Sequence, residues 1–217
     1  MTLDLEVAAD ADEAARRVGA LIAERAREAV DARGQFSVAL SKVPSTLVGA
    51  FVAANPPWGA VDVYQVDERV AAAGSPDRNL TAILAAFPPA AVETLLPMPV
   101  EAPDLEDAAR LYEEELADPL DVVHLGLGPD GHTASLVPGD PVVDVRDRRV
   151  AVTDEHKGFR RMTLTYPALD SAREIVWLVT GEEKRDILAR LLDGDESIPA
   201  GRISNDRQLV VADRAAV

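Results

Sequence analysis

The chain has 217 residues, 47% of them hydrophobic and 28% charged, a composition typical of a globular protein with a substantial core. Its formal net charge of −16 predicts repulsion of nucleic acid and of anionic membrane surfaces, so a site for an anion must be a local concentration of basic residues. Cysteine is absent, which excludes disulfides, thiolate nucleophiles and cysteine-based metal sites.

The first half of the chain alternates predicted helices with predicted strands. Ala14, Val18 and Ile22 recur at helical spacing and indicate an amphipathic helix over residues 10–31, ended by Arg33 and Gly34. The elements that follow are a buried strand at 36–40, a turn at 41–45, a helix at 46–54, a strand at 61–66, a helix at 77–87 opened by Ser75-Pro76, an irregular segment at 88–103 with a helical fragment at 90–95, and a helix at 105–116.

The second half begins with the most apolar predicted strand, at 122–127. Further elements are strands at 149–153, 162–165 and 174–179, a helix at 182–192, a turn at 198–201 and a last strand at 208–212. Alternating strands and helices favour βαβ units. We therefore expect one α/β domain spanning residues 1–217, with a mostly parallel, Rossmann-like sheet covered by helices on both faces.

Ligands of such sheets lie beyond the carboxyl ends of the strands. That rule predicts that four segments lie together at one edge of the sheet: residues 41–46, 67–69, 126–132 and 180–184. The third belongs to Leu125–Gly139, LGLGPDGHTASLVPG, where glycines surround His132 at the end of a strand. Glycine allows close approach of backbone to ligand, and histidine exchanges protons near neutral pH, so His132 is a candidate catalytic residue.

Gly126, Gly128 and Gly131 also match the pattern G-x-G-x-x-G of dinucleotide-binding turns. That interpretation fails because Pro138-Gly139 interrupts the helix that would have to face a pyrophosphate, and because the strand is third in order rather than first. A phosphate-binding loop of the Walker A type fails too, since no Gly-Lys-Ser/Thr follows the glycines.

Because of Leu125–Gly139, the sequence resembles the 6-phosphogluconolactonase family, within the glucosamine-6-phosphate isomerase/deaminase-like superfamily. The specific motif is GxGxDGHTASLxPG, and the resemblance extends from about residue 10 to the C-terminus. Four weaker pieces agree in order: Asp67-Glu68-Arg69-Val70, Arg161-Met162-Thr163-Leu164-Thr165, Thr180-Gly181-Glu182-Glu183-Lys184 and Ile198-Pro199-Ala200.

The resemblance implies hydrolysis of 6-phosphoglucono-δ-lactone to 6-phosphogluconate, the second step of the oxidative pentose phosphate pathway. His132 would act as general base and then acid, and Asp130 would orient its ring. Backbone N–H groups of the glycine-rich loop, at Gly128 and Gly131, are expected to meet the substrate and stabilise the oxyanion. The chemistry requires no cofactor and no metal, and the three histidines form no HxH or HExxH motif.

For the phosphate, the resemblance implies Arg161 and Lys184, with Arg69 as a further candidate. For Arg69 the alternative is an ion pair with Glu68 or a neighbouring carboxylate. Asp67 matches the position that holds a base in the deaminases; in a lactonase it is expected to bind sugar hydroxyls or position the loop.

The turn after the first strand departs from the family. Members usually carry a Ser-Gly-Gly-Ser-type turn that cradles the sugar phosphate, whereas this chain has Ser41-Lys42-Val43-Pro44-Ser45-Thr46 without glycine. We expect Ser41 and Lys42 to bind substrate, with the Lys42 charge replacing backbone donors; the alternative is a diverged member with altered substrate or activity.

The other two histidines are predicted to lie outside the chemistry. His124, inside the apolar strand, is expected to be a core or cleft-edge residue, and His156 a solvated loop residue, although its loop could fold over the phosphate.

Two alternative functions stay open. An amino-sugar phosphate isomerase/deaminase would be expected to carry an acidic residue shortly after the histidine, and residues 133–137 contain none. A non-catalytic phosphosugar-binding protein would explain the lost glycines, but not the retained Asp130 and His132. The sequence shows no signal peptide and no apolar run near 18 residues, so we expect a cytoplasmic monomer or homodimer with a sugar phosphate lactone as substrate and neither nucleic acid nor membrane as partner.

Overall fold

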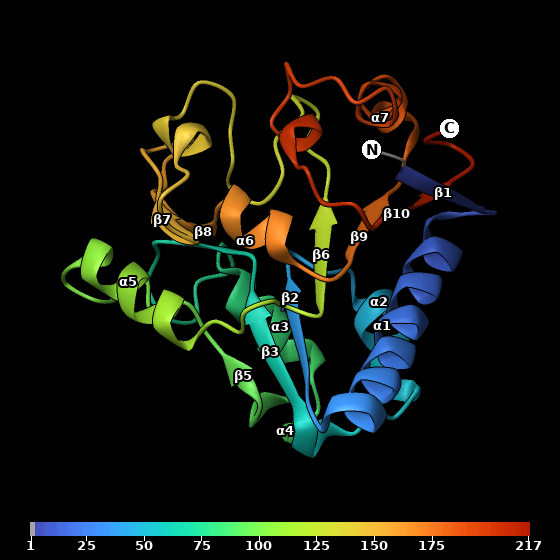
Figure 1. Ribbon diagram of the computed structural model, residues 1–217, viewed down its shortest axis with the longest axis horizontal. Coiled ribbons are helices and arrows are strands. Elements are labelled where there is room, and N and C mark those ends of the chain that lie inside the picture. The colour runs from blue at the N-terminus through green and yellow to red at the C-terminus, as the bar shows by residue number, and fades with distance from the viewer. Residues whose placement is uncertain (1–2) are drawn as a thin grey trace.

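The computed structural model of the chain describes residues 3–217 (Figure 1). Its centre is a seven-stranded parallel sheet in the strand order β1-β10-β9-β6-β2-β3-β5. The strands are β1 (Leu3–Ala8), β2 (Phe36–Leu40), β3 (Val61–Gln65), β5 (Leu95–Leu96), β6 (Val122–Gly126), β9 (Ile175–Val179) and β10 (Gln208–Asp213). The α/β class with a mostly parallel sheet is confirmed.

Helices cover both faces of this sheet. Side chains alternate along β2, so that Val38 and Leu40 enter one apolar cluster and Ala39 enters the other. The first cluster includes residues of α1 (Ala11–Arg33), α2 (Ser45–Ala53), α3 (Asn79–Ala86) and α4 (Pro89–Val92), and α1 and α2 lie side by side in Figure 1. The second includes residues of α5 (Leu105–Glu115), α6 (Tyr166–Ser171) and α7 (Arg185–Leu192).

A second, antiparallel sheet is not among the sequence predictions. It has the order β4-β8-β7, with β4 (Asp67–Arg69), β7 (Val150–Val152) and β8 (Arg161–Leu164). Its register places Arg69 opposite Arg161 and Asp67 opposite Thr163. Short 3₁₀ turns complete the fold: Trp58–Ala60, Pro141–Asp144, Glu182–Lys184 and Ala200–Arg202.

Both ends of α1 are capped, and its C-terminal end at Arg33 and Gly34 is the predicted one. The Asp10 side chain accepts a hydrogen bond from the Glu13 N–H at 2.8 Å, and Gly34 closes the helix in the left-handed conformation. The predicted start of α3 is wrong, because the helix begins at Asn79 rather than at Asp77. The carboxylate of Glu68, on β4, accepts the N–H groups of Asn79 and Leu80 at 2.8 Å each, so the helix is capped from a strand instead of from Ser75.

The helical fragment predicted at 90–95 is wrong at its end: α4 stops at Val92, and Leu95–Leu96 form β5, a two-residue strand paired with β3. Strand β1 and helix α6 were also missed. Strand β1 pairs only with β10 at the sheet edge, where Leu5 and Val7 stay exposed, and the period-two alternation of Leu3, Leu5 and Val7 with acidic residues was its only signal. Helix α6 is a six-residue segment with Pro167 in its first turn, too short to show helical periodicity.

Candidate active site

A cavity of about 400 Å³ opens where the sequence rule placed the ligand, beyond the carboxyl ends of β2, β3, β6 and β9. The basic side chains that line it are Lys42, Arg69, Arg161 and Lys184, and Asp67 is the acidic one. The chain as a whole carries 38 acidic against 22 basic residues. The cavity therefore reverses the polarity of the protein and suits an anionic ligand.

His132 stands on the cavity wall, in the loop that follows β6. Its Nδ1 makes a very short hydrogen bond with Oδ1 of Asp130, and the same oxygen accepts the His132 backbone N–H at 3.2 Å. A carboxylate accepts only, so Nδ1 carries the proton, and Nε2 is the nitrogen left with a lone pair. This is the arrangement of an oriented general base.

Asp130 is ionised in this pair. Partial burial pushes the pKa of Asp130 upward, but the hydrogen bonds from the side chain and backbone of His132 outweigh burial and lower it. An anionic Asp130 holds the Nδ1 proton and stabilises the imidazolium that forms when Nε2 takes a second one.

The two glycines of the loop shape it around His132. An ideal Cβ on Gly128 would lie 2.1 Å from Nδ1 and Cε1 of the ring, so the imidazole occupies the space that a side chain would fill. Gly131 has φ +81° and approaches Ile198 so closely that a Cβ would lie 2.5 Å from that side chain.

The N–H groups of these glycines are used inside the loop. That of Gly128 donates to the His132 carbonyl at 2.8 Å, and that of Gly131 to the Gly128 carbonyl at 3.0 Å. Donors for an oxyanion must therefore come from other groups. Gly128 lines the cavity, whereas Gly131 and Asp130 do not.

The predicted cations come from different elements. Arg161, on β8, is 7% exposed, and desolvation lowers the pKa of its guanidinium. Lys184 ends the turn after β9 and donates from Nζ to the Leu127 carbonyl at 2.8 Å. This hydrogen bond holds the ammonium group beside the loop of His132.

Arg69 makes an ion pair, one of the two roles that the sequence left open. Its Nη1 donates to the Asp77 carbonyl at 3.0 Å and lies 3.7 Å from the Asp77 carboxylate, so its ion-pair partner is Asp77 and not Glu68. Its guanidinium also lies 5.8 Å from the ring centroid of Phe159. The side chain still lines the cavity opposite Arg161, and two cations facing each other across a strand pair favour an anion between them.

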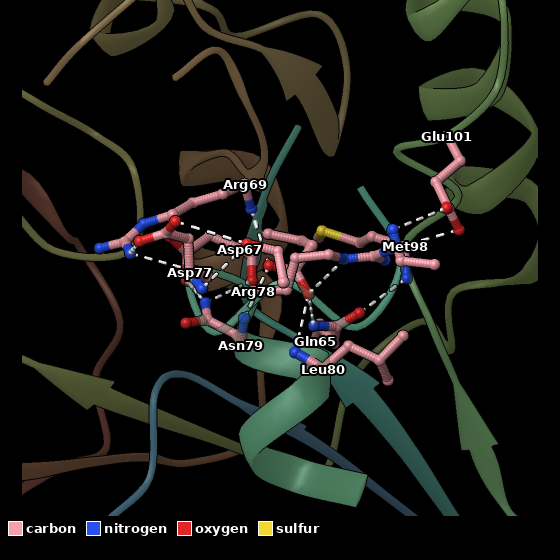
Figure 2. A network of polar contacts seen from close by, with 12 residues as sticks. Gln65, Asp67, Arg69, Asp77, Arg78, Asn79, Leu80, Met98 and Glu101 are labelled. Carbon is pink, nitrogen blue, oxygen red and sulfur yellow. Dashed lines mark hydrogen bonds and ion pairs between the residues drawn. The ribbon is translucent and has the colours of Figure 1, made fainter. Parts of the chain in front are cut away.

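Asp67 joins the two halves of the site. Its Oδ2 accepts the Ser135 hydroxyl at 2.6 Å. Its Oδ1 accepts the Asn79 amide at 3.0 Å (Figure 2). Desolvation raises the pKa of Asp67 despite the Ser135 hydrogen bond. Because Ser135 belongs to the loop of His132, this carboxylate ties that loop to the strand of Arg69.

Glu68 is a structural residue of the site that sequence reasoning did not single out. It is fully buried, and each of its oxygens accepts two hydrogen bonds, from the N–H groups of Arg69, Asn79 and Leu80 and the amide of Gln65, at 2.8–2.9 Å. Figure 2 shows the surrounding contacts, in which Gln65 also accepts the Met98 N–H at 2.9 Å. The one indication in the sequence is that Glu68 lies between Asp67 and Arg69, two candidate ligand-binding residues.

The turn after β2 brings Ser41 and Lys42 to the cavity, as expected. Ser41 Oγ lies 3.1 Å from Nδ1 of His124, which is 1% exposed within β6. His124 is thus both a core residue and a neighbour of the cavity wall. The structure places His156 differently from the prediction: it is half-buried, and burial together with the charge of Arg161 lowers its pKa.

Comparison with known proteins identifies the family. Residues 9–211 match the model of the glucosamine-6-phosphate isomerases/6-phosphogluconolactonase family. The chain belongs to this family. A 6-phosphogluconolactonase of Synechocystis sp. is 35% identical over 188 residues, covering 78% of this chain and 77% of the relative. A 6-phosphogluconolactonase of Mycobacterium tuberculosis is 31% identical over 241 aligned positions, covering 100% of this chain and 98% of the relative.

Solved structures of the family share the fold. A 6-phosphogluconolactonase from Shewanella baltica superposes with a TM-score of 0.84 at 22% identity, covering 97% of each chain. A monomeric glucosamine-6-phosphate deaminase has the same TM-score at 19% identity, covering 99% of this chain and 98% of its own. Fold similarity therefore does not separate the two activities.

No helix within residues 3–217 is long and apolar enough to cross a membrane. Within the same residues, no group of three or more histidine, aspartate or glutamate side chains is placed to hold a metal ion.

Proposed function

We propose that the protein is a 6-phosphogluconolactonase that opens 6-phosphoglucono-δ-lactone to 6-phosphogluconate. The observation that carries this proposal is the His132–Asp130 pair on the wall of a cavity that also holds four basic side chains. A general base beside an anion-binding surface is what a phosphorylated ester requires.

In the proposed mechanism, Nε2 of His132 accepts a proton from a water molecule while the water oxygen bonds to the lactone carbonyl carbon. The negative charge that develops on the carbonyl oxygen is stabilised by the cationic side chains of the cavity. As the tetrahedral intermediate collapses, the bond to the ring oxygen breaks and His132 returns its proton to that oxygen. The new carboxylic acid then loses its proton to solvent, and Asp130 holds the Nδ1 proton throughout.

Arg161, Lys184 and Arg69 bind the phosphate in this proposal, and Ser41 and Lys42, on the turn after β2, also line the cavity and contact the substrate. Arg161 contributes most per contact, because its nearly buried guanidinium acts in a medium of reduced dielectric. Asp67, whose two oxygens are already hydrogen-bonded to Ser135 and Asn79, positions the loops. A carboxylate engaged on both oxygens is poorly placed to act as the base of a deaminase.

The test is acid release from fresh 6-phosphogluconolactone, measured above the spontaneous rate for the wild type and His132→Ala. We expect a clear rate excess that the substitution removes. Absence of any excess in the wild type would refute the lactonase proposal; ammonia release from glucosamine 6-phosphate would then identify a deaminase, and binding of 6-phosphogluconate without turnover a binding protein.

The phosphate assignment has its own test with a matched control. Lys184→Met should weaken inhibition by 6-phosphogluconate far more than inhibition by gluconate, which lacks the phosphate. Lys157→Met, which removes an exposed lysine outside the cavity, should leave both unchanged. Equal losses for the two inhibitors in Lys184→Met would contradict the assignment.

A further inference from the structure

Ser41 and His124 form a polar pair at the end of two neighbouring parallel strands. His124 lies in β6 opposite Leu40 of β2, and its carbonyl accepts the Ser41 N–H at 3.3 Å. The Ser41 hydroxyl lies 3.1 Å from Nδ1 of His124 and lines the cavity, whereas the imidazole behind it is 1% exposed. Backbone and side-chain contacts together fix the relative position of the two residues.

In this hydrogen bond either the Ser41 hydroxyl or the Nδ1–H of His124 can be the donor, and the burial of the ring decides between the two. Desolvation lowers the pKa of His124 to about 4, so the ring is neutral at pH 7 and carries one proton. Nε2 is buried and has no hydrogen-bond partner among residues 3–217. A proton on Nε2 would be a buried, unpaired donor, which proteins avoid more strictly than an unpaired acceptor. The favoured tautomer therefore carries its proton on Nδ1.

With the proton on Nδ1, His124 donates to Ser41 Oγ and occupies one of its lone pairs. The hydroxyl proton must then point away from the ring, to the side on which Ser41 borders the cavity. Such a donor matters in this turn because Lys42-Val43-Pro44 contains no glycine and Pro44 has no N–H to offer.

We propose that His124 is a positioning residue that directs the Ser41 hydroxyl proton into the cavity, toward an anionic oxygen of the substrate. The inference rests on the proposed function for the identity of that oxygen, a phosphate oxygen of the sugar phosphate. The imidazole itself never touches the ligand and takes no part in proton transfer.

The tautomer can be observed without any turnover. Long-range ¹H–¹⁵N spectra of the uniformly ¹⁵N-labelled protein contain only three histidines, and His124→Asn assigns the signal of His124 by its loss. We expect the pattern of a neutral ring protonated on Nδ1 at pH 7. Protonation on Nε2 would overturn the inference even if the protein is an active lactonase, whereas a protein without turnover would leave this result intact.

A double-mutant cycle then tests whether His124 acts through Ser41. Ser41→Ala and His124→Leu should each weaken binding of 6-phosphogluconate by roughly 10-fold, the worth of one hydrogen bond, and raise KM more than they lower kcat. The double variant should bind no worse than Ser41→Ala, and His124→Asn, whose amide can donate near the Nδ1 position, should recover most of the loss. Additive losses, or no recovery with asparagine, would mean that His124 acts by packing alone.

Discussion

Gly128→Ala tests the geometry of the candidate base with a single added methyl group. The φ of Gly128 lies outside the left-handed region, so alanine meets no backbone strain there. Its Cβ would lie 2.1 Å from the His132 ring, whereas ordinary contact begins at 3.4 Å. The ring must therefore move by about 1.3 Å, the difference between the two distances, and its hydrogen bond with Asp130 must lengthen or break.

The expected cost follows from the precision that general-base catalysis demands. A displacement of about 1 Å at a reacting group costs on the order of 100-fold in rate, or about 2.7 kcal/mol of transition-state stabilisation. We therefore expect kcat/KM to fall about 100-fold, measured by acid release from fresh lactone. Binding of 6-phosphogluconate should change little, because the cations of the cavity are untouched. The melting temperature should fall only slightly, because the His132 side chain is 28% exposed and can yield to the added methyl group without disturbing the core.

Gly49→Ala is the matched control. Gly49 is exposed in α2, an added Cβ meets nothing within 4 Å, and alanine in a helix interior stabilises by roughly 0.5–1 kcal/mol. This variant should keep the wild-type kcat/KM and melt slightly higher. Wild-type activity in Gly128→Ala would refute the reasoning, since it would show that the ring position against Gly128 is not needed for catalysis.

Three further results are expected. Asp130→Asn keeps the side-chain shape but can turn an amide donor toward Nδ1, so kcat should fall by ~100-fold or more while KM changes little; an unchanged kcat would show that Asp130 does not orient the base. Burial raises the pKa of Asp67 above 3.8, so ionising this carboxyl lowers the stability of the folded state progressively as pH rises above that value. The melting temperature of Asp67→Asn, compared with that of the wild type, should therefore be more favourable at pH 7.5 than at pH 4, while activity falls. A difference that does not change with pH would mean that altered hydrogen bonds dominate. The pKa of His124 falls from 6.5 to about 4 on folding, so as pH falls from 6.5 to 4 the unfolded state takes up a proton that the folded state does not. This one group should therefore lower the free energy of unfolding, measured with urea, by about 3 kcal/mol over that range, and His124→Asn should lose less than the wild type. Equal losses would contradict the burial argument.

The parallel sheet was predictable because its signals are local. Apolar runs bounded by glycine and proline marked β2, β3, β6 and β9, and the rule that ligands lie at carboxyl ends of strands then placed the cavity correctly. Strand β4 gave no such signal, since three charged residues show neither an apolar run nor alternation. Its pairing with β8 is a tertiary contact, and this contact alone sets Arg69 opposite Arg161.

The contacts of the site that were missed are those between residues distant in the chain. Ser135 lies 68 positions from Asp67, and His124 lies 83 positions from Ser41. Serine and histidine in an apolar context give no indication of which partner they will meet. Glu68 appeared next to two candidate ligand-binding residues, yet burial and its four hydrogen bonds make it the cap of α3 instead.

The antiparallel sheet also explains how a strongly acidic protein brings basic side chains into one cavity. β4 carries Arg69 into the cavity and Asp67 toward the loop of His132, because neighbours two apart on a strand share a face. Glu68, between them, points the other way and holds the start of α3. One three-residue strand thereby joins a basic side chain of the cavity, the loop of His132 and a helix. In the proposed mechanism this strand couples binding and chemistry, so a substitution at Glu68 should disturb both together, whereas changes at Lys184 or His132 should separate them.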